Sequence, residues 1–152
     1  MRVLIVGGQG FIGLNVAEQL LLQGHVVALF GPNSAPSTFK EALSQLPGEL
    51  NIMEADVSRP HDVEHALQHF KPERVLNSAA ITAGLDREKY DARRIFEVNL
   101  LGTIELLEAC LRHRIPRVVQ LGTRPNEGWT SPRSGWVQFL GVGNTTPVYV
   151  IR

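Results

Sequence analysis

Cysteine is almost missing from this sequence, since Cys110 is the only one among 152 residues. A disulfide framework is therefore excluded, and a reducing compartment is the simpler environment. Cys110 lies on the apolar face of a helical pattern, so we expect it to be buried as a packing residue rather than to act as a reactive thiol.

Net charge and long apolar runs are also absent. The 15 basic and 15 acidic residues cancel, which leaves no general attraction for nucleic acid or for an anionic membrane. No apolar run approaches membrane-spanning length, and the run at residues 1–6 is too short for the core of a signal peptide. We therefore expect a cytoplasmic protein without nucleic-acid or membrane partners.

What is present is an alternation of short apolar runs with patterns of helical period. We expect strands at about 3–6, 26–30, 50–54, 74–77 and 116–121. The intervening segments predict helices over about 12–21, 38–46, 60–70 and 89–113. Strands that alternate with helices predict an α/β fold with a doubly wound parallel sheet of about five strands, and a ligand outside the carboxyl ends of those strands.

The first strand leads directly into three glycines with the spacing G-x-x-G-x-x-G. Gly7 allows a sharp turn, Gly10 lets the backbone approach a pyrophosphate, and Gly13 lets the following helix lie close to the sheet. The free N–H groups at the start of that helix would face the anion. Glycine-rich turns that bind nothing are common, so this pattern needs support from the rest of the chain.

That support comes from a series of motifs in a fixed order. The sequence resembles the extended short-chain dehydrogenase/reductases, the NAD-dependent epimerase/dehydratase group. The motifs are GGQGFIG at residues 7–13, DV at 56–57, NSAA at 77–80, VNLLGT at 98–103 with LLEA at 106–109, and VVQLGT at 118–123. The resemblance implies a Rossmann-type NAD(P)-binding domain over residues 1–123, with an empty, vestigial domain as the alternative.

The resemblance also implies which residues contact the dinucleotide. With Asn33, which lies at a place where the sequence departs from the family, the expected contacts are Gly7, Gly10, Phe11, Ile12, Gly13, Asn33, Asp56, Val57, Ser78, Ala79, Ala80 and Asn99.

Several of these residues also have a purely structural interpretation. Asp56 would bond the adenine with Val57 beside it, or it would cap the following helix. The small residues 77–80 would leave room for a ribose or simply pack tightly. We expect Asn99 to be buried and more structural than catalytic.

The end of the second strand departs from the family pattern. NAD enzymes commonly have an acidic residue there, and NADP enzymes a basic one, but residues 30–34 read FGPNS. Asn33 or Ser34 would bond a ribose or phosphate, or form an ordinary turn. The cofactor is therefore NAD or NADP, with the choice open.

Catalysis in the resembled family needs a Ser or Thr, a Tyr, and a Lys four residues after the Tyr. Thr123 and Tyr149 match the first two positions, while the Lys would be residue 153, beyond Arg152. The run 148–151 is more typical of a strand than of the helix that the family has there, so Tyr149 is either catalytic or a terminal aromatic at a coincidental spacing. We expect a chain that is C-terminally truncated relative to the family.

Residues 124–152 form an irregular tail rich in glycine and proline, with possible short strands at 136–140 and 148–151. Elsewhere, His61, His65 and His69 recur on the solvent side of a helix, and we expect no metal site there.

Two functions remain open. One is the dinucleotide-binding part of an enzyme acting on a small carbonyl or hydroxyl substrate, such as a nucleotide sugar, without turnover by this chain alone. The other is a non-catalytic dinucleotide sensor or interaction module. Apolar faces left uncovered would favour a homo-oligomer.

Overall fold

A central sheet organises the chain in this computed structural model, which describes residues 1–33, 37–82, 85–122, 137–139 and 148–151. Five of its strands are parallel: β1 (Arg2–Val6), β2 (Val26–Gly31), β3 (Glu49–Glu54), β4 (Arg74–Asn77) and β5 (Val118–Leu121). The strand order is β3-β2-β1-β4-β5-β7-β6. The predicted doubly wound α/β fold is confirmed.

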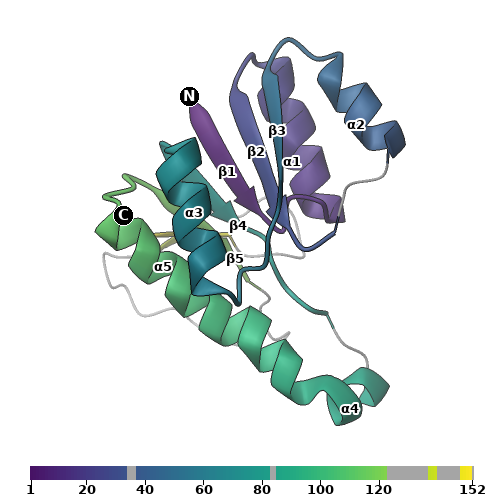
Figure 1. The fold of residues 1–152 in the computed structure, drawn as a ribbon, viewed down its shortest axis with the longest axis vertical. Helices are drawn as coiled ribbons and strands as arrows, with labels where there is room; N and C mark the ends of the chain where they lie inside the picture. Colours follow the sequence, from purple (N-terminus) through teal and green to yellow (C-terminus); the bar gives the residue numbers. More distant parts are fainter. Residues whose placement is uncertain (34–36, 83–84, 123–136, 140–147, 152) are drawn as a thin grey trace.

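Helices cover both faces of this sheet (Figure 1). They are α1 (Phe11–Leu22), α2 (Ser37–Ser44), α3 (Pro60–Phe70), α4 (Leu85–Phe96), the π-helical segment η1 (Glu97–Leu101) and α5 (Gly102–Arg112). The first two lie on one face, and α3 with α5 lies on the other. This arrangement follows from right-handed crossovers between parallel strands. The chain runs across the sheet from β1 to β3 and then in the opposite direction from β3 to β4 and β5. The helices of the two directions therefore lie on opposite faces.

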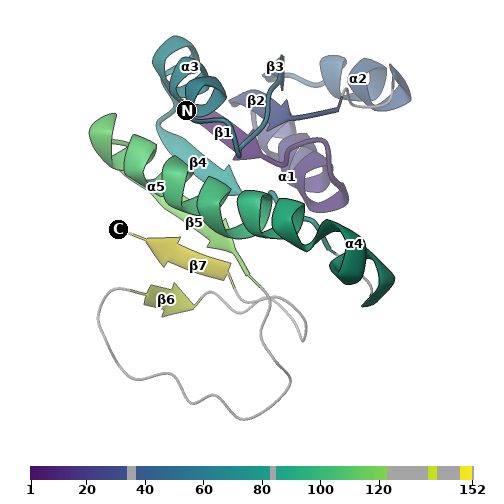
Figure 2. The same ribbon diagram turned by 60° about the horizontal axis from the view of Figure 1, so that its bottom comes forward.

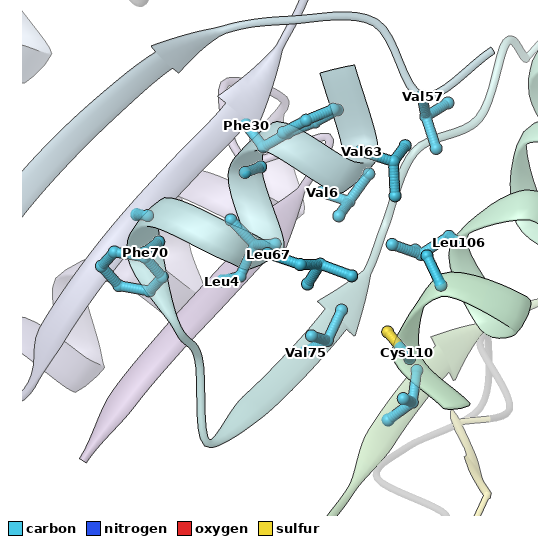
Figure 3. Packing of buried hydrophobic residues seen from close by; sticks show 14 of the residues in the cluster. Leu4, Val6, Phe30, Val57, Val63, Leu67, Phe70, Val75, Leu106 and Cys110 are labelled. Atoms are coloured by element: carbon cyan, nitrogen blue, oxygen red, sulfur yellow. The ribbon is translucent and has the colours of Figure 1, made fainter. Parts of the chain in front are cut away.

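The two faces share strands but not side chains. Along β1, Val3 and Ile5 pack toward α1, while Leu4 and Val6 pack toward α3 and α5, because successive side chains of a strand alternate. Figure 3 shows the buried side chains on the face covered by α3 and α5, where Cys110 lies beside Leu106 and Val75. Cys110 is buried as predicted, and burial raises the pKa of its thiol to about 12.

The register of the inner strands determines where the site forms. Val6, the last residue of β1, is in register with Phe30 of β2 and with Asn77 of β4. Strands β2 and β4 lie on opposite sides of β1. The carboxyl ends of these three strands therefore border one crevice, the place where ligands of such sheets bind.

The predicted helix over residues 89–113 is present but is not one regular α-helix, because the structure divides it into α4, η1 and α5. Asp91 has non-helical dihedrals (φ −130°, ψ 21°), and η1 contains a π-type hydrogen bond from the Gly102 N–H to the Glu97 carbonyl. A π-segment inserts an extra residue without interrupting the apolar pattern, so periodicity alone does not reveal it.

Two further strands follow β5. Strand β7 (Val148–Ile151) pairs antiparallel with β5, and β6 (Val137–Phe139) pairs antiparallel with β7 (Figure 2). The strand predicted at 148–151 is therefore present, and the one predicted at 136–140 is present over the described residues 137–139. The division of the chain at residue 123 stays a prediction. Among the described residues, no helix has both the length and the apolar character to cross a bilayer.

Candidate functional site

The turn after β1 is closed by backbone hydrogen bonds and leaves no room for a side chain at Gly7 or Gly8. The N–H groups of Gly7 and Gly8 donate to the Phe30 carbonyl at 2.8 and 3.2 Å. Gly7 has φ +75°, which favours glycine, and a Cβ there would lie 2.6 Å from the backbone nitrogen of Ala79. The first glycine therefore serves both the turn and the close approach of the loop after β4.

The other two glycines of the motif have different surroundings. A Cβ on Gly13 would lie 2.6 Å from the Gly8 Cα, so this glycine packs on the turn at the end of β1. Its role in letting α1 lie close to the sheet stays a prediction. A Cβ on Gly10 would meet only the Gly7 carbonyl oxygen at 3.2 Å. Gly10 is also the N-cap of α1, where no side chain forms a cap and no acidic residue occupies the first turn. An anion therefore fits at this helix start.

A cleft of about 520 Å³ opens at the carboxyl ends of the strands, a size typical of small-molecule sites. Its lining includes eight of the predicted contact residues: Gly7, Gly10, Asn33, Asp56, Val57, Ser78, Ala79 and Ala80. The structure therefore brings together predicted residues from four separate loops. Their assignment to a dinucleotide stays a prediction.

The remaining predicted contacts lie outside this lining. Phe11 and Ile12 are exposed on the first turn of α1, and Gly13 is buried beneath it. Their side chains do not border the cleft, although the backbone of this turn adjoins Gly10.

Asp56 belongs to a compact polar network at one end of the cleft. Its Oδ1 accepts bonds from the Ser58 N–H at 2.9 Å and the Ser58 hydroxyl at 2.7 Å, and its Oδ2 accepts a bond from Arg94. Arg94 Nη1 also donates to the Ser58 hydroxyl at 2.6 Å. Burial acts to raise the pKa of Asp56, but the bonds from Ser58 and Arg94 outweigh it and hold the pKa below its usual value.

The helix-cap interpretation of Asp56 is wrong. Helix α3 begins at Pro60 after the N-cap Arg59, and no side chain caps it. Asp56 instead forms a local turn with Ser58, and its own N–H donates to Asp62 Oδ2 at 2.9 Å. The adjacent Val57 is held by α5, because a Cβ on Gly102 would lie 2.9 Å from Val57 Cγ1.

The loop after β4 is fixed by two asparagines. Asn77 is completely buried, and its Nδ2 donates to Gln120 Oε1 at 2.8 Å. Asn99 is exposed, so its predicted burial is wrong, because η1 turns this side chain toward the loop at the surface. Its Oδ1 accepts from the Ile81 N–H at 2.7 Å, and its Nδ2 donates to the Ile81 carbonyl at 3.0 Å. Both contacts support the structural role predicted for Asn99.

The two predicted catalytic residues are not brought together by described contacts. Thr123 lies outside the described residues. Tyr149 lies in β7, where its backbone is paired with Gln120. The catalytic assignment of both residues stays a prediction.

The lining also contains residues that were not predicted as contacts, among them Gln9, Gly31 and Arg94. Gln9 lies within the glycine motif at a variable position, and Gly31 ends β2, so only their proximity in space makes them notable. Arg94 is separated from Asp56 by a helix and a strand, and no sequence spacing links the two.

The predicted histidine row is exposed on α3, with ring centroids 6.3 Å apart for His61 and His65 and 4.1 Å apart for His65 and His69. No group of metal-binding side chains is found in the described part of the chain.

Comparison with known proteins identifies the family. A model of the NAD dependent epimerase/dehydratase family matches residues 3–138. The chain belongs to this family. The predicted resemblance is thereby confirmed, and so is the nicotinamide dinucleotide as the cofactor class of the family, with NAD or NADP left open.

Relatives of this epimerase/dehydratase family member include several enzymes. Human short-chain dehydrogenase/reductase family 42E member 1 is 33% identical over 80% of this chain. The UDP-glucose 4-epimerase of Mycolicibacterium smegmatis is 28% identical over 97% of this chain. The solved structure of Thermus thermophilus UDP-glucose 4-epimerase in complex with NAD shares 34% identity and a TM-score of 0.63 over 76% of this chain.

The chain is much shorter than these relatives. It spans 29% of the human protein, 46% of the mycobacterial epimerase and 35% of the Thermus thermophilus chain.

Proposed function

We propose that this member of the epimerase/dehydratase family binds a nicotinamide dinucleotide in the cleft at the carboxyl ends of β1, β2 and β4. The observation that carries the proposal is the open approach to Gly10, where an uncapped helix start meets a glycine without a facing side chain. Positive helix ends and free N–H groups favour a pyrophosphate at this place. The family match and the NAD complex of a relative agree with this ligand.

The rest of the lining divides the cleft into two ends. Gly31, Asn33 and the Asp56–Val57 pair lie on the β2–β3 side, where the adenosine half would bind. Ser78, Ala79 and Ala80 lie after β4, where small side chains leave space for the nicotinamide half. When bound, the dinucleotide would supply hydride exchange. The protein's own part is to hold the phosphates at the glycine turn and to orient the two halves by the β2 and β4 loops.

We further propose that the complete reaction acts on a small carbonyl or hydroxyl substrate, such as a nucleotide sugar, in the reducing cytoplasm. Relatives with such printed activities, including UDP-glucose 4-epimerases, support this substrate class. We expect these 152 residues alone not to turn over a substrate. Tyr149 lies in strand β7 (Val148–Ile151), whereas a residue four positions away lies beside such a tyrosine only on a helix, so the described backbone at Tyr149 does not provide that arrangement.

The same strand supports the second candidate, a dinucleotide sensor without catalysis. In that case the bound dinucleotide would set a conformation, and Tyr149 would serve only the sheet. Replacing Tyr149 by Phe in a chain extended by downstream sequence separates the candidates. An enzyme predicts that the extended chain turns over substrate and that the variant loses this turnover while it still binds the dinucleotide. A sensor predicts no turnover in either protein and unchanged dinucleotide binding.

Titration of the purified chain with NADH and NADPH, followed by nicotinamide fluorescence, tests the binding proposal. We expect saturable binding of at least one nucleotide and no steady-state turnover. Absence of binding to both would overturn the proposal, and robust NAD(P)-dependent turnover by this chain would contradict the expected inactivity.

We also propose a homo-oligomer. The support is a set of apolar side chains that α4, η1 and α5 leave exposed: Phe96, Leu100, Leu101, Ile104 and Leu111. Large apolar side chains left exposed along consecutive helical segments favour association.

A further inference from the structure

The end of β2 lacks a charged side chain at the position that usually distinguishes the two nicotinamide dinucleotides. An acidic residue there accepts the ribose hydroxyls of NAD, and a basic residue nearby accommodates the 2′-phosphate of NADP. In this chain the strand ends at Gly31 and is followed by Pro32 and Asn33. The usual sequence signal for cofactor choice is therefore missing.

Gln9 occupies the space that such a side chain would take. A Cβ on Gly31 would lie 1.9 Å from Gln9 Oε1 and 3.0 Å from Gln9 Cδ, well inside contact distance. The present position of Gln9 and any side chain at residue 31 therefore exclude each other. An amide from the glycine turn replaces the side chain of the second strand.

The amide of Gln9 is not satisfied by the protein. Its Nε2 is buried and has no hydrogen-bond partner among the described residues, although Gln9 lines the cleft. A buried donor without a partner carries a desolvation cost, which a hydrogen bond to a ligand oxygen in the cleft would remove. The donor therefore indicates where an oxygen of the ligand would bind.

The charges around Gln9 do not oppose a phosphate. In the described lining of the cleft, Asp56 and Arg94 are the charged residues, and they form an ion pair with each other. The carboxylate that would repel a 2′-phosphate at the end of β2 is replaced by a neutral amide. Both a hydroxyl and a phosphate can accept a hydrogen bond from this group.

We propose that Gln9 is the residue that determines cofactor choice, by donating its amide N–H across Gly31 to the 2′-oxygen of the adenosine ribose. The inference rests on the proposed binding of a nicotinamide dinucleotide in this cleft. Its consequence is that the chain binds NADPH at least as tightly as NADH.

The test is the ratio of the NADPH and NADH dissociation constants in the wild type and in Gln9→Glu, measured by fluorescence titration. This variant keeps the shape of the side chain and puts a carboxylate beside the 2′-position. We expect the dissociation constant of NADPH to rise about tenfold or more relative to that of NADH, because the new carboxylate repels the 2′-phosphate. Gln19→Glu, an exposed change of the same charge on α1, is the control and should leave the ratio unchanged.

A second variant covers the case in which Gln9→Glu fails to fold, as judged by circular dichroism. Gln9→Ala combined with Gly31→Asp removes the steric conflict and restores an acidic residue to β2, and it should produce the same shift. A wild type that binds NADH about tenfold more tightly than NADPH, or an unchanged ratio in the folded variant, would overturn the role of Gln9. Binding of neither nucleotide by the wild type would instead overturn the proposed function itself.

Discussion

At the scale of single residues, the three glycines of the turn have separable roles. Gly7 has φ +75° and lies against the backbone of Ala79, whereas Gly10 has ordinary extended dihedrals (φ −78°, ψ 168°) and faces the cleft. The motif therefore combines a requirement of the fold with a requirement of the ligand, and substitutions should separate the two.

Gly7→Ala should lower the free energy of unfolding by about 2 kcal/mol or more, because it forces a side chain into a left-handed conformation and a backbone contact. Gly10→Val should lower that free energy by no more than about 1 kcal/mol, because valine is a poorer N-cap than glycine and its Cβ meets only the Gly7 carbonyl oxygen. It should weaken dinucleotide binding by about tenfold or more, because its side chain enters the phosphate position. Urea unfolding and fluorescence titration measure the two effects. Equal losses of stability in both variants would contradict this division.

Asp56 gives a second prediction at this scale, a dependence of stability on pH. Its pKa is lower in the folded protein than the ordinary 3.8, so the charged carboxylate stabilises the fold above that value. The contribution is lost as the pH falls through the lower, folded-state pKa. Asp56→Asn should therefore lower the free energy of unfolding by about 1 kcal/mol at neutral pH.

The difference in the free energy of unfolding between the wild type and Asp56→Asn should shrink as the pH falls below 3.8. Urea unfolding at a series of pH values measures it. Glu18→Gln, which neutralises an exposed carboxylate on α1, is the control and should show no such convergence. A difference that stays constant down to low pH would argue against the ion pair with Arg94.

At the scale of elements, the sequence predicts those whose apolar pattern is local. The five parallel strands and α1 to α3 follow from short apolar runs and helical periodicity. The π-segment η1 does not, because VNLL continues the apolar pattern while the backbone gains a residue. The contacts between Gln9 and Gly31 and between Asp56 and Arg94 are equally invisible, because each joins loops that only the sheet brings together.

Segment η1 nevertheless has a function in the site, since it presents Asn99 to the loop after β4. Asn99→Leu removes both hydrogen bonds to Ile81, so hydrogen exchange of the Ile81 amide should accelerate by about five- to tenfold. Asn15→Leu is the control, because Asn15 donates to Phe11 within its own helix. Unchanged exchange at Ile81 would show that the loop is held by other contacts.

At the scale of the whole molecule, the helices cover the sheet but leave apolar surface of their own. The α4–η1–α5 rod extends past the end of the sheet (Figure 1), and Phe96 and Leu100 on it are 62% and 51% exposed. A second copy of the chain presents the same surface, and a two-fold axis can bring two such surfaces together.

Phe96→Glu should therefore convert an oligomer of this chain into a monomer, because a charged side chain in an apolar interface would be buried without a partner. Light scattering coupled to size-exclusion chromatography measures the mass directly. Phe39→Glu is the matched control, since Phe39 is 47% exposed on α2, at a distance from the rod (Figure 1), and its replacement should leave the mass unchanged. A monomeric wild type would contradict self-association and would leave the apolar surface to a different partner. An oligomer that persists in Phe96→Glu would place the interface on another face of the molecule.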